Sequence, residues 1–298
     1  MSADTELFPG FTTHRIATSG AEIHCVVGGS GPPLLLLHGY PQTHAMWHRV
    51  APRLAERHTV VCADLRGYGD SSKPASDAAH AAYSKRAMAQ DMVEAMRALG
   101  HARFRLVGHD RGGRVSHRLC LDHPDAVERV AVLDISPTRA MYRGTTQAFA
   151  TAYYHWFFLI QPFDLPEHLI GADPGYYLRR KLGGWGSSAS VFDPRAFAEY
   201  ERCFADTATI HATCEDYRAA ASIDLEHDAA DIAAGRKVRC PLLVLWGDKG
   251  VVHRLFAPLA DWAEVAVDVR GRALSCGHYL AEEVPDETLA ELERFLTA

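Results

Sequence analysis

Short apolar runs alternate with helical patterns through the first half of the chain. The aliphatic residues 34–37 and the apolar residues 59–63 predict two buried strands. The segments "RFRLVGHD", from Arg103, and "VERVAVLDIS", from Val127, predict two more. Short buried strands separated by helical segments are typical of a mostly parallel sheet flanked by helices.

The helices between these strands are amphipathic. In residues 83–100 the apolar side chains recur at spacings of one, three or four, and Gly100 is a C-terminal stop signal. The segment "RGGRVSHRLCLDHP" predicts a helix directly after the third strand, ended by Pro124. Residues 285–298 predict a last amphipathic helix.

The alternation of strands and helices stops between residues 138 and 235. This segment carries aromatic and polar helical patterns such as "FATAYYHWFFLIQPF" and no buried strand pattern. Strand patterns return in "VRCPLLVLWGDKG" and in "VAVDVR", residues 265–270. We therefore expect residues 1–137 and 236–298 to form one core, with residues 138–235 inserted as a helical cap after the strand that ends near Asp134.

Composition is that of an ordinary globular protein. Of the 298 residues, 48% are hydrophobic and 23% charged, and the net charge of -6 argues against nucleic acid or an anionic membrane as partner. No signal peptide and no membrane-spanning run is predicted. The seven cysteines form no C-x-x-C pair, so we expect reduced thiols in a cytoplasmic protein.

The stretch "LVGHDRGGR" has the outline of G-x-S-x-G, the strand-to-helix turn that presents a nucleophile, with Asp110 in place of the serine. Gly108, Gly112 and Gly113 suit a close approach of strand and helix. Unlike serine, aspartate is ionised at neutral pH and needs no base to become a nucleophile. A carboxylate can displace a leaving group from saturated carbon and leave an ester on the protein.

Hydrolysis of that ester requires a base, and the candidate is His278 in "SCGHYLAEEVP". An acid should orient the imidazole, and two aspartates end predicted strands, Asp134 in "VLDIS" and Asp248 in "WGDKG". Topology alone does not choose between them.

With these residues in place, the whole chain resembles the fluoroacetate (haloacetate) dehalogenases of the α/β-hydrolase superfamily. The shared segments are "HGYPQT" with "MWHRV", "DLRGYGDS", "GHDRGGR", "VLDI", "YHWFF", "LWG" and "GHYLAEE". The resemblance implies an α/β-hydrolase fold and a homodimer. It favours Asp134 over Asp248 as the acid, with Asp110 as nucleophile and His278 as base.

The resemblance also implies substrate contacts. Arg111 and Arg114 would bind a substrate carboxylate, offsetting its repulsion by Asp110, and a planar guanidinium can do so bidentately. His155, Trp156 and Tyr217 would donate hydrogen bonds to the departing halide. The backbone N–H groups of Tyr40 and Arg111 would hold the oxyanion during ester hydrolysis.

The remaining polar side chains are interpreted as structural. A metal site is not expected from the histidines near "HGYP", since no nearby acids complete a ligand set. Trp185 is a candidate for lining the pocket, and His109 is expected to pack within the turn. The histidines for which no metal role is expected are His38, His44 and His48. The residues expected to support a loop are Asp64, Arg66 and Asp70.

The leading hypothesis is hydrolytic dehalogenation of a short 2-haloacid to a hydroxy acid and halide, without cofactor. The first alternative is an epoxide hydrolase, which would use the same aspartate with two cap tyrosines as acids. Candidates for these are Tyr153, Tyr154, Tyr176, Tyr177 and Tyr217. Arg111 and Arg114 discriminate, because a neutral epoxide needs no cation. The second alternative is a receptor of this fold that binds a small molecule without turnover.

Overall fold

One eight-stranded sheet organises the chain in the order β1-β2-β4-β3-β5-β6-β7-β8. The computed structural model describes residues 6–297, so the ends of the predicted core at residues 1–5 and 298 lie outside the described residues. The strands are β1 Thr12–Ala17, β2 Glu22–Gly28, β3 Pro33–Leu37, β4 Thr59–Ala63, β5 Phe104–His109, β6 Val127–Leu133, β7 Leu242–Gly247 and β8 Val269–Leu274. From β4 to β8 every pairing is parallel, whereas β2 pairs antiparallel with both of its neighbours.

The core lies along the middle strands. The leucines of β3 are at most 1% exposed, because β3 pairs with β4 on one side and β5 on the other and helices cover the sheet. Helix α4 (Arg111–Asp122) packs on β5 and β6, with α3 (Lys85–Ala98) beside it. Parallel strands place their carboxyl ends along one edge of the sheet, so the ends of β5, β6 and β7 are neighbours there.

Shorter elements complete the core. The α-helices are α2 Ala51–Leu54, α13 Val251–Leu255, α14 Pro258–Val265, α15 Leu280–Glu283 and α16 Pro285–Thr297. The 3₁₀ helices are η1 His44–Trp47, η2 Ala81–Tyr83 and, within the segment between β6 and β7, η3 Ala189–Val191.

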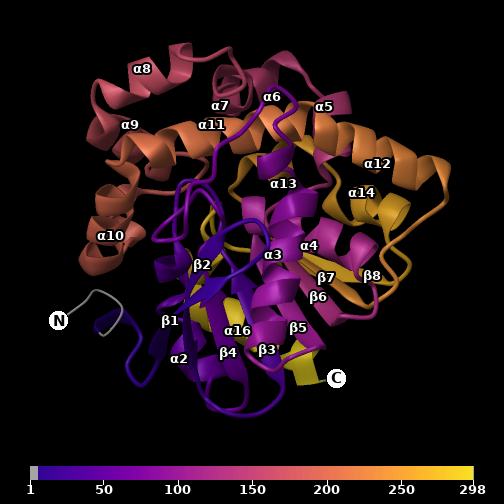
Figure 1. The fold of residues 1–298 in the computed structure, drawn as a ribbon. Helices are drawn as coiled ribbons and strands as arrows, with labels where there is room; N and C mark the ends of the chain where they lie inside the picture. The colour runs from indigo at the N-terminus through magenta and orange to yellow at the C-terminus, as the bar shows by residue number, and fades with distance from the viewer. Residues whose placement is uncertain (1–5, 298) are drawn as a thin grey trace.

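The chain between β6 and β7 forms helices joined by loops, with no strand among its described residues. Its helices are α5 Thr138–Arg143, α6 Gln147–Ala152, α7 Tyr154–Phe158, α8 Leu165–Gly171, α9 Pro174–Leu182, α10 Pro194–Phe204, α11 Thr207–Ala221 and α12 Ile223–Ala233. In Figure 1 most of them gather above the sheet, with α11 and α12 running across the top. The division into a core and a cap at residues 138 and 235 stays a prediction.

The α/β fold class is confirmed, and the predicted strand at residues 59–63 coincides with β4. The predicted strand at residues 265–270 is wrong in position. Helix α14 extends to Val265, Ala266 makes only an isolated bridge with Val238, and β8 begins at Val269. As an edge strand, β8 exposes alternate side chains such as Arg270 and Arg272, so its apolar signal is weak.

No helix in residues 6–297 combines the length and the apolar character that crossing a bilayer requires.

Candidate active site

Asp110 sits on a strained turn between β5 and α4. Its φ is +44°, a conformation that costs a non-glycine residue energy and that the surroundings must enforce. A Cβ on Gly112 would lie 2.4 Å from the His38 carbonyl oxygen, and one on Gly108 would lie 2.4 Å from the Ser116 hydroxyl. The glycines therefore allow β3, β5 and α4 to meet closely enough to present Asp110 at the edge of the sheet.

The Asp110 carboxylate is buried but held ionised. Burial by itself raises the pKa of this carboxyl, but the charges of His278, Arg114 and Arg111 outweigh burial and lower the pKa below its ordinary value. The backbone N–H of Tyr40 donates to Asp110 Oδ1 at 3.0 Å. A desolvated carboxylate with few hydrogen-bond donors is a competent nucleophile.

His278 and Asp134 form a buried pair. His278 Nδ1–H donates to Asp134 Oδ2 at 2.6 Å, and the Gly247 backbone N–H donates to Oδ1 at 3.0 Å. Asp248 is exposed. The geometry thus brings Asp134, rather than Asp248, to the imidazole.

The protonation of His278 depends on its neighbours. Burial lowers the pKa of the imidazole, but the hydrogen bond and charge of Asp134, with the charge of Asp110, raise it above its ordinary value. His109 Nε2–H donates to the His278 carbonyl oxygen at 2.9 Å, and burial lowers the pKa of His109 to about 3. His109 therefore positions the backbone of His278 as a neutral donor, in addition to packing in the turn.

Arg111 is fully buried and largely occupied by a partner that sequence reasoning missed. Its Nε and Nη2 donate to the Asp216 carboxylate at 2.9 and 2.6 Å, while Nη1 has no partner. The guanidinium lies 4.2 Å from the centre of the Tyr217 ring. Binding of a substrate carboxylate by Arg111 stays a prediction, and Asp216 already occupies two of the nitrogens that a bidentate contact would use. One nitrogen remains for a further acceptor.

Arg114 is held in a similar way by neutral groups. Its Nη1 donates to the Ser136 carbonyl at 3.1 Å and to the Thr138 hydroxyl at 3.0 Å, and its Nη2 contacts the Met141 sulfur at 3.2 Å. Its Nε is buried without a partner, and the guanidinium lies 4.7 Å from the centre of the Trp156 ring. None of these contacts of Arg114 is to a carboxylate, so its positive charge remains available to a ligand in the candidate site.

Three expected halide donors come together from two cap helices. His155 and Trp156 belong to α7 and Tyr217 to α11, and the Tyr217 ring centre lies 5.5 Å from His155 and 6.4 Å from Trp156. The side-chain atoms His155 Nδ1, Trp156 Nε1 and Tyr217 Oη are buried without partners. Buried polar groups are normally hydrogen-bonded, so unpaired donors gathered in one place indicate a ligand site.

The cap contributes two charged groups that no motif revealed. Asp216 also pairs with Lys85 of α3, which links the cap to the core. Lys181 of α9 is buried against the ring of Tyr154, 3.6 Å from its centre, and burial lowers its pKa to about 7. Asp216 could have been found from the sequence, because it directly precedes the candidate residue Tyr217, and an acid next to a site residue often orients a neighbouring side chain. Lys181 carried no such signal.

Trp185 lies where sequence reasoning suggested. Its ring centre is 5.1 Å from that of His278 and 4.8 Å from that of His155, so its side chain lies between these two candidate residues. Its indole N–H donates to the Ala152 carbonyl at 3.3 Å.

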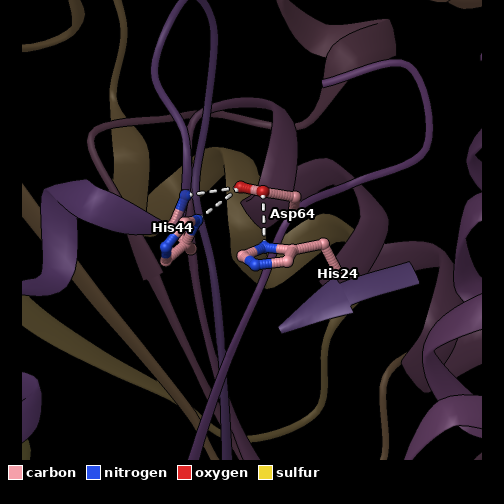
Figure 2. Close-up of side chains that lie close together, drawn as sticks. All are labelled: His24, His44 and Asp64. Atoms are coloured by element: carbon pink, nitrogen blue, oxygen red, sulfur yellow. Dashed lines mark hydrogen bonds and ion pairs between the residues drawn. The ribbon is translucent and has the colours of Figure 1, made fainter. Parts of the chain in front are cut away.

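The side chains His24, His44 and Asp64 carry donor types that a metal ion could use, and they lie within reach of one another. Figure 2 shows both rings turned toward the Asp64 carboxylate. The ring contacts are hydrogen bonds, 3.0 Å from His24 Nδ1 and 2.9 Å from His44 Nδ1. Asp64 also accepts backbone N–H groups of His44 and Asp70 at 2.7 and 3.0 Å. These contacts tie the turn after β4 to the segment that carries Tyr40, which agrees with a supporting role.

Known proteins resemble this chain in sequence and in fold. A family model described as the alpha/beta hydrolase fold matches residues 32–271. The chain is 51% identical to a fluoroacetate dehalogenase from Burkholderia sp, over 98% of this chain and 95% of that protein. It is 37% identical to a soluble epoxide hydrolase from Corynebacterium sp. (strain C12), over 92% and 93%. A crystal structure from Nostoc sp PCC 7120, titled an alpha/beta hydrolase, superposes with a TM-score of 0.95 at 61% identity, covering 96% of this chain and 98% of that one.

Proposed function

The chain belongs to the α/β-hydrolase family, and on that premise we propose that it is a hydrolytic dehalogenase converting short 2-haloacids, such as fluoroacetate and chloroacetate, to hydroxy acids plus halide. One observation carries the proposal. Five buried donor atoms have no partner, two of them on the guanidinium groups whose charges keep Asp110 ionised and three on side chains of α7 and α11. A small molecule that is anionic at one end and carries an electronegative leaving group at the other would satisfy all five.

In the first step an Asp110 carboxylate oxygen attacks the carbon that bears the halogen. The new C–O bond forms as the carbon–halogen bond breaks, and the halide leaves with the bonding electrons. His155, Trp156 and Tyr217 would stabilise the charge that develops on the halide. Burial lowers the pKa of His155 well below its ordinary value, so the imidazole is neutral and can donate one N–H.

The substrate carboxylate would be held by one nitrogen from each arginine. Arg111 Nη1 and Arg114 Nε are the unpartnered nitrogens, whereas the rest of each guanidinium is fixed by the protein. Such pre-organised donors cost little conformational entropy on binding. Their charges also offset the repulsion between the substrate anion and Asp110.

In the second step water hydrolyses the ester, and His278 acts as the base. Formation of the ester removes the negative charge of Asp110, which is one of the groups that raise the pKa of His278. The imidazole then gives up its proton more readily, at the stage when a neutral base is needed. The Tyr40 N–H, which already contacts Asp110 Oδ1, would hold the oxyanion of the tetrahedral intermediate.

An epoxide hydrolase is the second candidate function, supported by the similar epoxide hydrolase. It would need two buried tyrosine hydroxyls to protonate the ring oxygen. Tyr154 and Tyr176 are exposed, and the Tyr177 hydroxyl accepts a hydrogen bond from that of Tyr40 at 3.2 Å. Of the tyrosines considered from the sequence, Tyr217 contributes a buried hydroxyl without a partner and Tyr153 is also buried, but the donors that neighbour Tyr217 are His155 and Trp156 rather than a second of these tyrosines.

Substrate choice tests the proposal. We expect halide release from chloroacetate and fluoroacetate, and turnover of chloroacetamide with kcat/KM lower by about 10²-fold or more, since each charge-assisted hydrogen bond is worth ~1.5–3 kcal/mol. The assay measures halide and, with styrene oxide, diol. Diol formation without halide release from any haloacid would establish the epoxide hydrolase instead. Tight binding with no turnover of either class would establish a receptor.

Removal of the Asp216 charge tests how Arg111 is positioned. We expect Asp216→Asn to raise KM for chloroacetate about tenfold, equivalent to ~1.4 kcal/mol, with a smaller change in kcat, because Arg111 would no longer present Nη1 to the substrate. Asp224→Asn is the matched control, since Asp224 also pairs with Lys85 but accepts no hydrogen bond from Arg111. Equal rises in KM for both variants would contradict a positioning role of Asp216.

We further propose that the protein is a cytoplasmic homodimer. All seven cysteines are free, which fits a reducing compartment. Helices α7–α9 and the segments around them expose large apolar side chains that a second copy could cover, namely Tyr154, Phe163, Leu165, Leu169 and Tyr176.

A further inference from the structure

Two cysteines from distant parts of the sequence meet at the end of the sheet opposite Asp110. Cys120 lies in the last turn of α4, and Cys240 lies two residues before β7. Their sulfur atoms are 3.9 Å apart, in hydrogen-bond contact. Because α4 packs on β6 and β6 pairs with β7, this contact follows from the sheet order.

The two sulfurs lie close enough to form a disulfide after one side chain rotates. A disulfide places its sulfur atoms about 2.05 Å apart, and rotation of one side chain about its Cα–Cβ bond moves a sulfur by more than the remaining gap. Cys120 is buried and Cys240 is partly exposed, so the Cys240 sulfur can contact solvent while the Cys120 sulfur lies beside it, largely shielded from solvent.

The two sulfurs differ in their electrostatic surroundings. The contact with Cys120 and the charge of Arg129 lower the pKa of Cys240 below its ordinary value, although burial acts in the opposite direction. The structure describes all seven cysteines, and the other six have raised pKa values, chiefly through burial or, for Cys120, through its contact with Cys240. A thiolate is the reactive form, so Cys240, which is also partly exposed, is the candidate for the attacking sulfur.

Cys240 is partly exposed, and a hollow open to solvent lies beside Cys120. The hollow has a volume of about 350 Å³ and is lined in part by Cys120, Arg236, Lys237 and Arg239. Solvent therefore reaches Cys240 directly and reaches the Cys120 side of the pair through this hollow.

We propose that Cys240 and Cys120 form a redox-active dithiol, which a small peroxide converts to a disulfide. The Cys240 thiolate attacks one peroxide oxygen, the O–O bond breaks, and a sulfenic acid and hydroxide form. The Cys120 thiol then attacks the sulfenic sulfur, giving the S–S bond and water. The two sulfurs together lose two electrons, which the peroxide accepts.

The disulfide would link the last turn of α4 to the segment before β7, at the ends of these two elements that lie away from the candidate site. Helix α4 begins next to Asp110, and the N–H of Gly247 at the end of β7 donates to Asp134. The cross-link would also close a loop that contains the whole segment between α4 and β7. Closing a long loop restricts the unfolded chain and stabilises the fold.

The test is peroxide oxidation of the intact protein. Reduced protein is treated with hydrogen peroxide, remaining thiols are blocked with N-ethylmaleimide, and intact mass and linked peptides are measured. We expect a loss of about 2 Da, two fewer blocked thiols and a peptide joining Cys120 to Cys240. The oxidised protein should melt roughly 5 °C higher, and dithiothreitol should reverse this shift.

Single variants separate the steps. Cys120→Ser should leave a sulfenic acid on Cys240, trapped by dimedone, while Cys240→Ser should give neither product. Cys62→Ser, at a buried thiol with a raised pKa, is the matched control and should still form the link. Oxidation that leaves Cys120 and Cys240 unlinked, or a 2 Da loss that persists in both single variants, would overturn the proposal.

Discussion

Replacement of His278 by asparagine is expected to trap the covalent ester on Asp110. Asparagine cannot accept a proton from water, so the second step should slow by about 10⁴-fold, while attack by Asp110 does not require the imidazole. Exposure of His278→Asn to chloroacetate should therefore add about 58 Da, the mass of a carboxymethyl group replacing a proton, to nearly every molecule. Intact mass spectrometry measures the adduct, and peptide mapping places it.

Two further variants make this result interpretable. Asp110→Asn should remain unmodified, because the nucleophile is gone. His117→Asn removes a buried histidine of α4 that packs against Trp262, away from the proposed chemistry, and should turn over without accumulating ester. If folded His278→Asn stays unmodified after exposure to substrate, the covalent route is wrong.

Replacement of Asp134 by asparagine is expected to have an effect of similar size, about 10⁴-fold on ester hydrolysis. Asp134 accepts from His278 Nδ1 at 2.6 Å and so keeps Nε2 free to act as the base. An asparagine amide can donate to Nδ1 instead, which would leave the proton on Nε2 and block base catalysis. Single-turnover kinetics should show ester formation followed by slow release of glycolate.

Asp248→Asn is the matched control for that prediction. Asp248 has the same residue type at the end of the next strand, but it is exposed. We expect its ester hydrolysis to stay within about twofold of the parent protein, in line with most surface substitutions. A harmless Asp134→Asn, or a larger loss in Asp248→Asn, would transfer the orienting role to Asp248.

Local patterns predicted the elements nearest the candidate site. The aliphatic residues 34–37 and the apolar residues 59–63 became β3 and β4, and the helix expected after "LVGHD" is α4. These elements are buried on both faces, so their composition reports their environment directly. The strands β1 and β2 were missed. β1 is an edge strand that alternates exposed and half-buried residues, and the apolar run of β2 is interrupted by the polar residues Glu22 and His24, although β2 pairs on both sides.

The order of the candidate residues along the chain could also be predicted from the sequence. An aspartate on a glycine-rich turn implied ester chemistry, and that chemistry requires a base; the candidate His278 lies later in the sequence and meets Asp134 in the structure. The resemblance singled out His155, Trp156 and Tyr217, and the fold brings their rings together.

The sequence by itself determined the fold class and the carboxylate at the turn, because both follow from local patterns of residues, and its resemblance to a family supplied the residues expected around that carboxylate. Only the tertiary structure decided which aspartate meets His278, that Asp216 occupies two nitrogens of Arg111, and that Cys120 lies beside Cys240. Each of these pairs is joined by sheet order or by the folding of the cap over the core. No local pattern records such a contact, since its two members lie more than a hundred residues apart.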